Sequence, residues 1–449
     1  MVNELQELLR ANVADPPHDR LDLGAVVRGG RRRVRRRRNV AIGAAAFATA
    51  GIVAAGAVLQ GGGGGTEIAG EPPAPDAPTL TLADATTAVA GRDYRELASY
   101  TNDDLDSDNG QYLDGMTDDG LVLFRDGPRA DQRYPRFALL DPATGTKDWL
   151  PRLPDVTQNQ TTPVALGEDR LVLLGYEEDP TASTDGFLVR LVAFVFDRDD
   201  RRWSTVSWPG LPAVESPSVL VGPDDRLYVR TPATRPGPPP GGWPVGPDGE
   251  AEDADAEGET NHLWSVSLTD PADVRDEGLE VGDVAFTGSA MVWTDSRNGD
   301  AGRIHVRDLA TGAEHSFDPR SGERCNLLSF GAAGDRIAMG QYCGTYEGGV
   351  RDDRVQVVST DGRQVVTLQG SGLDGGLVPG SQVVTVTAYG DEDGTYVYDL
   401  AGDRLLRISD TTSSWASTTG PAGEPSRFSW MTPVNRNDGA TQHIGELLR

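Results

Sequence analysis

An aspartate-rich stretch contains the residues of this chain best suited to metal chemistry, because carboxylate oxygens are the ligands that Ca²⁺ prefers. Counted from Asp104, carboxylates fall at the first, third and fifth positions of an EF-hand loop, the later two being Asp106 and Asp108. The sixth position is Asn109, where the EF-hand turn needs Gly, and the twelfth is Gly115, where it needs a bidentate Glu. The spacing therefore fails the test for calcium. We expect a solvated acidic loop here and no metal site.

Histidines are the other residues suited to catalysis or metal binding, and the five are scattered along the chain: His18, His262, His305, His315 and His443. None of them forms the H-x-x-x-H or H-E-x-x-H spacing of a metal site. His305, within an Ile-His-Val run, is expected to be a strand residue. The sequence also lacks a G-x-S-x-G elbow, a P-loop and a dinucleotide fingerprint. We therefore predict a protein that is not an enzyme and needs no cofactor.

The two cysteines, Cys325 and Cys343, are predicted to form a disulfide. Their midpoint falls in the turn-rich segment 331–335, which is flanked by strand-like runs. A hairpin turning there would place the two cysteines opposite one another on antiparallel strands, within reach of a disulfide. Such a bond would stabilise the fold by about 3 kcal/mol in the chain-entropy model. The alternative is a pair of small buried thiols.

Taken from the N-terminus, the first element of the chain is an arginine cluster that is followed by an apolar segment. Residues 39–59 contain no charge and would rise about 30 Å as a helix, which matches the hydrocarbon thickness of a bilayer. Arginines on one side only would hold that side in the cytoplasm. We therefore expect a cytoplasmic segment (1–38), a transmembrane helix (39–60), a Gly/Pro-rich linker (61–78) and an extracytoplasmic domain (79–449). The topology-determining arginines are Arg31, Arg32, Arg33, Arg35, Arg36, Arg37 and Arg38.

A cleaved signal peptide is the alternative interpretation of this region. The apolar segment is dominated by Ala and Gly, and Arg37-Arg38 before it is weakly similar to a twin-arginine signal. Residues 55–57, Ala-Gly-Ala, could serve as a cleavage site. Against cleavage, 38 residues precede the apolar run, whereas whole signal peptides are normally 15–30 residues long. We therefore favour a retained single-pass anchor in the cytoplasmic membrane.

The predicted cytoplasmic segment has a helical pattern of its own. Leu5, Leu8 and Leu9 fall at helical spacing, and a second short helix is expected over residues 19–27. Such a pair is too small to bury a core alone. It is either a disordered tail beside the membrane or a segment that folds on a cytoplasmic partner.

Charge is distributed very unevenly between the two ends of the chain. The net charge is -28, but residues 1–38 carry 10 Arg against 5 acidic residues, which leaves 31 basic and 64 acidic residues in the remainder. A domain this acidic repels phosphate backbones. We therefore exclude nucleic acid as a partner of the large domain.

The large domain shows a repeated pattern of short strands and turns that predicts an all-β fold. One piece of the repeat is a strand, a turn and a second strand, found at 137–145, 194–200, 264–270, 304–312, 355–362 and 396–402. A polar turn and a short apolar strand precede it, giving seven expected inner strands at 121–124, 171–174, 227–229, 291–293, 337–339, 383–386 and 428–431. The repeat of about 48 residues is typical of four-stranded propeller blades. We predict a β-propeller of seven blades, with six or eight as alternatives.

Two further segments complete this expected fold. Residues 79–87 are expected to supply the missing outer strand of the last blade and so close the ring. Residues 232–261 interrupt the third blade with a Pro/Gly-rich and then acidic run of low complexity. We expect this insertion to be a disordered loop.

The blade pieces at 307–312, Arg-Asp-Leu-Ala-Thr-Gly, and 398–402, Tyr-Asp-Leu-Ala-Gly, resemble the outer hairpins of WD40-like and TolB-type bacterial propellers. The whole layout resembles single-pass bacterial proteins with an extracytoplasmic propeller, some of which are similar to membrane-bound anti-sigma factors. That resemblance implies that Leu5, Leu8 and Leu9 bind a sigma factor. The zinc-type anti-sigma motif is missing, because the cytoplasmic part has no cysteine and only His18.

The sequence therefore predicts a non-enzymatic, membrane-anchored propeller that binds a ligand or protein outside the cytoplasmic membrane and relays to a cytoplasmic partner. The alternative is a secreted propeller enzyme, such as a glycosidase or lyase with paired carboxylates at a central channel.

Overall fold

The computed structural model describes residues 77–103, 110–127, 134–154, 161–178, 189–213, 218–322, 324–377, 382–389, 392–411, 427–434 and 440–448. All of them belong to one of the two compact units of the chain, Ala48–Arg449. The predicted cytoplasmic segment, the predicted membrane span and the linker up to residue 76 lie outside the described residues. Across the described ranges, no helix has both the length and the hydropathy needed to cross a bilayer.

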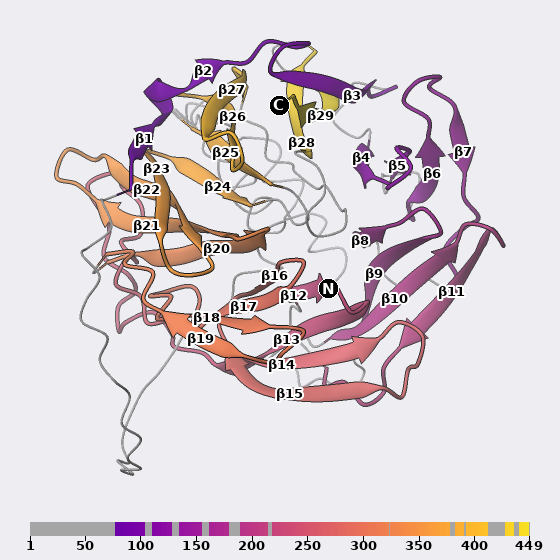
Figure 1. Ribbon diagram of the computed structural model, residues 1–449, viewed down its shortest axis with the longest axis horizontal. Coiled ribbons are helices and arrows are strands. Elements are labelled where there is room, and N and C mark those ends of the chain that lie inside the picture. Colours follow the sequence, from indigo (N-terminus) through magenta and orange to yellow (C-terminus); the bar gives the residue numbers. More distant parts are fainter. Residues whose placement is uncertain are drawn as a thin grey trace, which may run out of the picture. The chain divides into compact units, whose positions relative to one another are not determined.

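The described residues of this unit form seven sheets, and each is a blade numbered here in chain order (Figure 1). Blade 1 comprises β4 (Gln111–Met116), β5 (Val122–Asp126), β6 (Arg136–Leu140) and β7 (Lys147–Trp149). Blade 2 comprises β8 (Thr162–Leu166), β9 (Arg170–Glu178), β10 (Val189–Asp197) and β11 (Arg202–Ser207). Blade 3 comprises β12 (Ser218–Val221), β13 (Arg226–Thr234), β14 (Thr260–Ser267) and β15 (Val274–Val281). Blade 4 comprises β16 (Val284–Phe286), β17 (Ala290–Thr294), β18 (Ile304–Asp308) and β19 (Glu314–Phe317).

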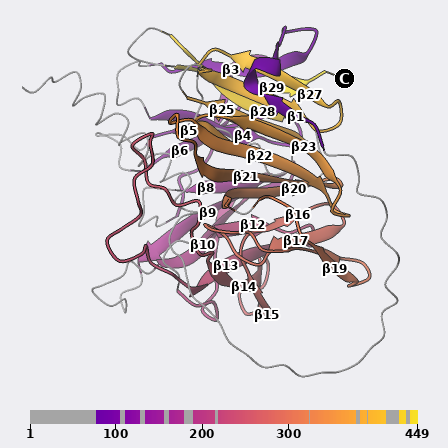
Figure 2. The same ribbon diagram turned by 90° about the vertical axis from the view of Figure 1, so that its left-hand side faces the viewer.

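The remaining blades contain strands from both ends of the described chain. Blade 5 comprises β20 (Asn326–Ala333), β21 (Arg336–Thr345), β22 (Arg351–Ser359) and β23 (Gln364–Gly370), with β1 (Thr79–Thr81) paired to β23 in parallel (Figure 2). Blade 6 comprises β24 (Leu373–Leu377), β25 (Val383–Ala388), β26 (Gly394–Asp399) and β27 (Arg404–Ser409), with β2 (Thr86–Thr87) beside β27. Blade 7 has three described strands, in the order β28 (Arg427–Pro433), β29 (Ala440–Leu447) and β3 (Tyr94–Thr101).

Apolar contacts between neighbouring blades close the sheets into a ring. Each of seven buried clusters draws its side chains from two adjacent blades. The cluster between blades 7 and 1, for example, packs Ala98 and Ile444 against Leu113 and Phe124. Burial of this apolar surface provides the main stabilisation between the sheets. The predicted all-β fold, a seven-bladed β-propeller, is therefore confirmed.

The strand that completes blade 7 is β3, so the prediction that residues 79–87 do so is wrong. Those residues form two very short strands separated by a 3₁₀ turn, Leu82–Asp84, and they extend the outer edges of blades 5 and 6. β3 is eight residues long and pairs along β29 from Tyr94 to Thr101. The Tyr94 ring packs edge-on against Phe428 and Trp430, which anchors the strand in the blade.

Six of the seven segments predicted as inner strands fall on the second strands of blades 1 to 6, and each of these has another strand before it. Residues 171–174, for example, lie in β9, and β8 precedes them. The sequence obscured the first strands because these are short or contain Gly. β24 reads Leu-Asp-Gly-Gly-Leu. In blade 7 the predicted strand 428–431 lies in β28, the first described strand of that sheet.

The Asp-Leu-Ala-Thr-Gly turn at 308–312, within one of the two pieces that resemble known propellers, has a simple physical basis. Asp308 ends β18, and its carboxylate accepts the backbone N–H groups of Ala310 and Thr311 at 3.1 and 2.7 Å. Gly312 has a φ of 72°, where a side chain would be strained, and its N–H donates to the Asp308 carbonyl at 2.8 Å. Residues 141–145 repeat this turn in blade 1, with Gly145 at a φ of 71°.

The predicted disulfide between Cys325 and Cys343 is present, and the hairpin that was predicted to create it is β20–β21. Cys325 directly precedes β20 and Cys343 lies near the end of β21. The bond therefore fixes the open end of this hairpin.

The acidic insertion does not form the predicted disordered loop. Residues 235–259, called the strap below, run from the end of β13 to the start of β14 and lie against blade 5. Ala254 and Ala256 of the strap are buried, at 3% and 8% exposure. Its composition suggested disorder, but ion pairs with arginines more than 60 residues away in sequence hold it in place.

Candidate functional site

The candidate site is a cavity of about 480 Å³ lined by residues of blades 1 to 5. The turns between the first two strands of blades 1, 2, 3 and 4 contribute to its lining, together with residues 330–332 of β20. These turns therefore lie at the same end of the propeller, which we call the mouth. Successive strands of a blade are antiparallel, so the β13–β14 connection that forms the strap lies at the opposite end.

Apolar side chains form most of the cavity wall. They come from the innermost strands β8, β12, β16 and β20, and they are Ala165, Leu166, Leu220, Val221, Val284, Ala285, Phe286, Phe330 and Ala332. Phe286 is held by a tilted contact with Tyr228, with ring centroids 4.6 Å apart. The cavity therefore has rigid apolar walls built by strands.

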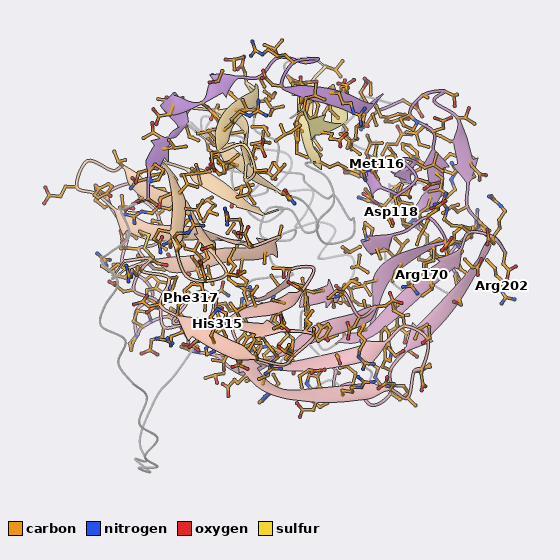
Figure 3. All side chains as sticks on the ribbon, in the orientation of Figure 1. Met116, Asp118, Arg170, Arg202, His315 and Phe317 are labelled. Carbon is orange, nitrogen blue, oxygen red and sulfur yellow. A yellow bond between two sulfur atoms is a disulfide. The ribbon has the colours of Figure 1, made fainter. Side chains whose placement is uncertain are left out.

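Three charged residues also line the cavity: Asp118, Arg170 and Asp225. Arg170 donates to the Asp225 carboxylate across the gap between blades 2 and 3. Figure 3 shows Asp118 and Arg170 nearer the centre of the ring than Arg202 of β11, which lies at its outer rim. Two carboxylates and one guanidinium therefore give the lining an acidic balance.

A second ion pair involves Asp119, the residue next to Asp118 in the turn between β4 and β5. Arg198 donates through both terminal nitrogens to Asp119, at 2.8 and 2.7 Å. The Arg198 hydrogen bonds lower the pKa of Asp119 to about 2, so this carboxylate stays ionised throughout the physiological pH range. Arg198 also donates to the Gly167 carbonyl at 3.0 Å, which ties the mouth turns of blades 1 and 2 together.

The strap crosses the opposite end of the propeller and is attached to blade 5 by ion pairs. Asp248 accepts from Arg351 at 3.2 Å, and Asp255 accepts from Arg324 at 2.6 Å. Arg324 directly precedes Cys325, so one anchor of the strap stands next to the disulfide. The disulfide and the strap therefore stabilise the same corner of blade 5.

A buried charge cluster holds the base of the strap. Arg230 of β13 donates to Asp283, and Arg297 lies 3.8 Å from Asp283 and 4.0 Å from Glu259, the last strap residue. Burial opposes the charge of Asp283, but Arg297 and Arg230 hold the pKa of its carboxyl below its usual value. Burial raises the pKa of Glu259 to about 7, although Asn298 donates to it at 2.8 Å. These groups stabilise the fold and are not part of the cavity lining.

The four described histidines lie on strands: His262 in blade 3, His305 and His315 in blade 4, and His443 in blade 7. His305 of β18 stacks on its cross-strand partner Trp293, with centroids 5.0 Å apart, and His443 of β29 stacks in the same way on Trp430, at 4.7 Å. The prediction that His305 is a strand residue is confirmed. Within the described ranges, no group of three or more His, Cys, Asp or Glu side chains is arranged to hold a metal ion.

Most predicted site residues lie outside the described residues. These are Leu5, Leu8 and Leu9 and the seven arginines of the N-terminal cluster. The loop of Asp104, Asp106 and Asp108, where no metal site was expected, also lies outside the described residues. The cavity residues were not predicted as a site. The available signal was the Asp-Gly or Asp-Arg pair before the second strands of blades 1, 2 and 3, which the sequence presented only as a turn.

Comparison with known proteins finds similar solved structures but no family to which the chain can be assigned. The chain matches no family model, and no curated protein matches its sequence significantly. Among solved structures, a prolyl endopeptidase is 14% identical over 74% of this chain and 45% of its own, with a TM-score of 0.39. The propeller domain of the Trilobed protease from Pyrococcus furiosus is 8% identical over 61% of this chain and 79% of its own, with a TM-score of 0.36. An uncharacterised protein from Listeria monocytogenes is 7% identical over 78% of this chain and 91% of its own, with a TM-score of 0.42. The chain thus spans less than half of the prolyl endopeptidase.

Proposed function

We propose that this protein is a non-enzymatic binding propeller, anchored in the cytoplasmic membrane by residues 39–60, that holds a ligand or protein partner outside the cell at the mouth of its channel. The observation that carries the proposal is the apolar cavity, to which five blades contribute. Cavities of this size with a few charged groups are typical small-molecule sites. Residues 1–38 would then lie in the cytoplasm and relay occupancy to a partner such as a sigma factor, through Leu5, Leu8 and Leu9.

Fractionation of the native host tests the anchor and the relay. We expect the full-length mass in the membrane fraction, with the propeller accessible to protease added outside the cell. We also expect a tagged full-length chain to retain one specific cytoplasmic protein, and a Leu5→Ala/Leu8→Ala/Leu9→Ala variant to lose it. A soluble product beginning after about residue 57 would overturn the anchored model, because that cleavage would follow the signal-peptide pattern.

One observation favours the alternative of a secreted propeller enzyme, such as a glycosidase or lyase. Asp118 and Asp225 line the same cavity, and paired carboxylates are the usual catalytic groups of glycoside hydrolysis. Asp225 is also paired with Arg170. A glycan screen distinguishes the two functions. Turnover that disappears in both Asp118→Asn and Asp225→Asn would establish the enzyme and displace the binding role.

A further inference from the structure

We propose that the cavity at the mouth binds an organic ammonium ion, that is, a ligand with an apolar body and one positively charged nitrogen. This inference rests on the proposed binding function and specifies its ligand class. Three features of the lining support it: apolar walls, two aromatic rings, and an acidic balance of charge.

The walls and volume suit an apolar body of modest size. About 480 Å³ lies within the range of small-molecule sites, roughly 300–1,000 Å³. The wall residues of β12 and β16 are aliphatic apart from Phe286. Transfer of an apolar group from water into such walls is favourable in proportion to the area buried.

The two aromatic rings come from neighbouring blades, Phe286 from β16 and Phe330 from β20. The face of an aromatic ring attracts a cation, and the attraction increases when water is excluded. Phe286 is only 8% exposed and packs against the Tyr228 ring, with centroids 4.6 Å apart. A trimethylammonium or similar group is a suitable occupant because it tolerates loss of hydration better than a small, strongly hydrated ion.

The surrounding charges favour a cation over an anion. The turns between the first two strands of blades 1, 2 and 3 carry six carboxylates: Asp118, Asp119, Glu168, Asp169, Asp224 and Asp225. Three arginines stand beside them, since Arg170 and Arg226 begin the strands that follow and Arg198 lies in the β10–β11 turn. All three are paired with carboxylates, Arg170 with Asp225, Arg198 with Asp119 and Arg226 with Asp273. Low-dielectric walls concentrate the field of such a rim within the cavity. An anionic ligand would have to compete with these carboxylates for each arginine.

A matched set of probes tests the ligand class on the purified full-length chain. Benzyltrimethylammonium, its uncharged carbon isostere neopentylbenzene and the anion benzylsulfonate share one apolar body and differ in charge. Equilibrium dialysis, with the same buffer and detergent on both sides, removes the contribution of partitioning. We expect the ammonium to bind at least about ten-fold more tightly than neopentylbenzene and to weaken as salt is raised, and we expect no saturable binding of benzylsulfonate.

Two substitutions place the site, and one distant substitution serves as the control. Phe330→Leu should weaken ammonium binding by roughly 2- to 30-fold, the range expected for a cation–π contact, and should leave neopentylbenzene within about two-fold. Asp118→Asn should weaken the ammonium alone. Trp149→Leu removes an aromatic ring on the outer strand β7 and should change neither ligand. Thermal melting verifies that each variant is folded.

Other outcomes separate this inference from the binding function on which it rests. If neopentylbenzene binds as tightly as the ammonium, the ligand class is overturned while the cavity remains a binding site. If benzylsulfonate binds best, the sign of the charge is overturned. If none of the probes binds, or if both substitutions leave ammonium binding unchanged, the inference fails altogether. Membrane fractionation and partner capture then judge the anchored propeller independently.

Discussion

The two ends of the propeller hold their charges in different ways. At the mouth, the side chains of Arg170 and Asp225 are 33% and 53% exposed. At the base of the strap, the side chains of Arg230 and Asp283 are 8% and 12% exposed and share a cluster with Arg297. An exposed pair contributes little to stability, whereas removing one partner of a buried pair leaves an uncompensated charge. The cluster of Arg230, Asp283 and Arg297 is therefore suited to rigidity, whereas the Arg170–Asp225 pair can change partners at little energetic cost. The mouth also has a less exposed pair, Arg198–Asp119, whose side chains are 13% and 30% exposed.

The largest effect is expected from Asp283→Ala at the strap end, and this substitution tests the comparison between the two ends. Removal of this carboxylate leaves Arg230 and Arg297 buried without their shared partner, so we expect the free energy of unfolding to fall by about 3–5 kcal/mol. Denaturant unfolding of the full-length chain measures the change. A loss below about 1 kcal/mol would show that the cluster is not rigid and would remove the contrast between the two ends.

Loss of the disulfide should have the next largest effect. In the Cys325→Ser/Cys343→Ser variant, we expect about 3 kcal/mol less stability from the chain-entropy term, and faster proteolysis within the strap because Arg324 anchors it beside Cys325. Ligand binding at the mouth should persist. Added reductant provides the control, since it should destabilise the natural chain and leave the variant unchanged. Equal strap cleavage in the two proteins would contradict the link between disulfide and strap.

Titration of Glu259 should give a smaller effect that depends on pH. Burial raises the folded-state pKa of Glu259 to about 7 from an ordinary value of 4.5, in the presence of Arg297, Asp283, Arg235 and Asn298. Because the folded state retains the proton to higher pH, this group's contribution to stability is complete below about pH 4.5 and is lost as pH rises through about 7. The stability of the natural chain should therefore fall relative to Glu259→Gln between about pH 5 and pH 8. Parallel pH profiles for the two proteins would rule out this titration.

The smallest effect on stability is expected at the mouth. Arg170→Ala removes an exposed ion pair, so the free energy of unfolding should change by less than about 1 kcal/mol. The same substitution makes the lining more acidic, so binding of benzyltrimethylammonium should tighten by a few-fold. Matched measurements on Arg198→Ala extend the test to the neighbouring pair. Weaker binding in Arg170→Ala would mean that the guanidinium itself contacts the ligand, and would favour an anion site.

Much of the propeller could be predicted from short-range chemistry. Alternating strand residues and Asp-x-Ala-Thr-Gly turns give recognisable hairpins because the turn depends only on residues such as Asp308 and Gly312, which lie four positions apart. The disulfide was predictable for the same reason, since Cys325 and Cys343 flank a single hairpin. The errors came from segments with long-range partners. β3 pairs with β29 across about 350 residues, and the strap is fixed by Arg351 about 100 residues away.

The candidate site also combines features that the sequence alone determined with features that only the tertiary structure determined. The sequence by itself determined the all-β blade repeat, the disulfide, the acidic balance of the large domain and the carboxylate-rich turns, because each depends on composition or on neighbours in the chain. Only the tertiary structure decided that turns from four blades and one strand of a fifth meet at a single cavity, that Arg170 pairs with Asp225, and that Phe286 and Phe330 line the same space. The physical reason is that ring closure brings together residues up to about 200 positions apart, and no local pattern encodes which end of a blade each turn will occupy.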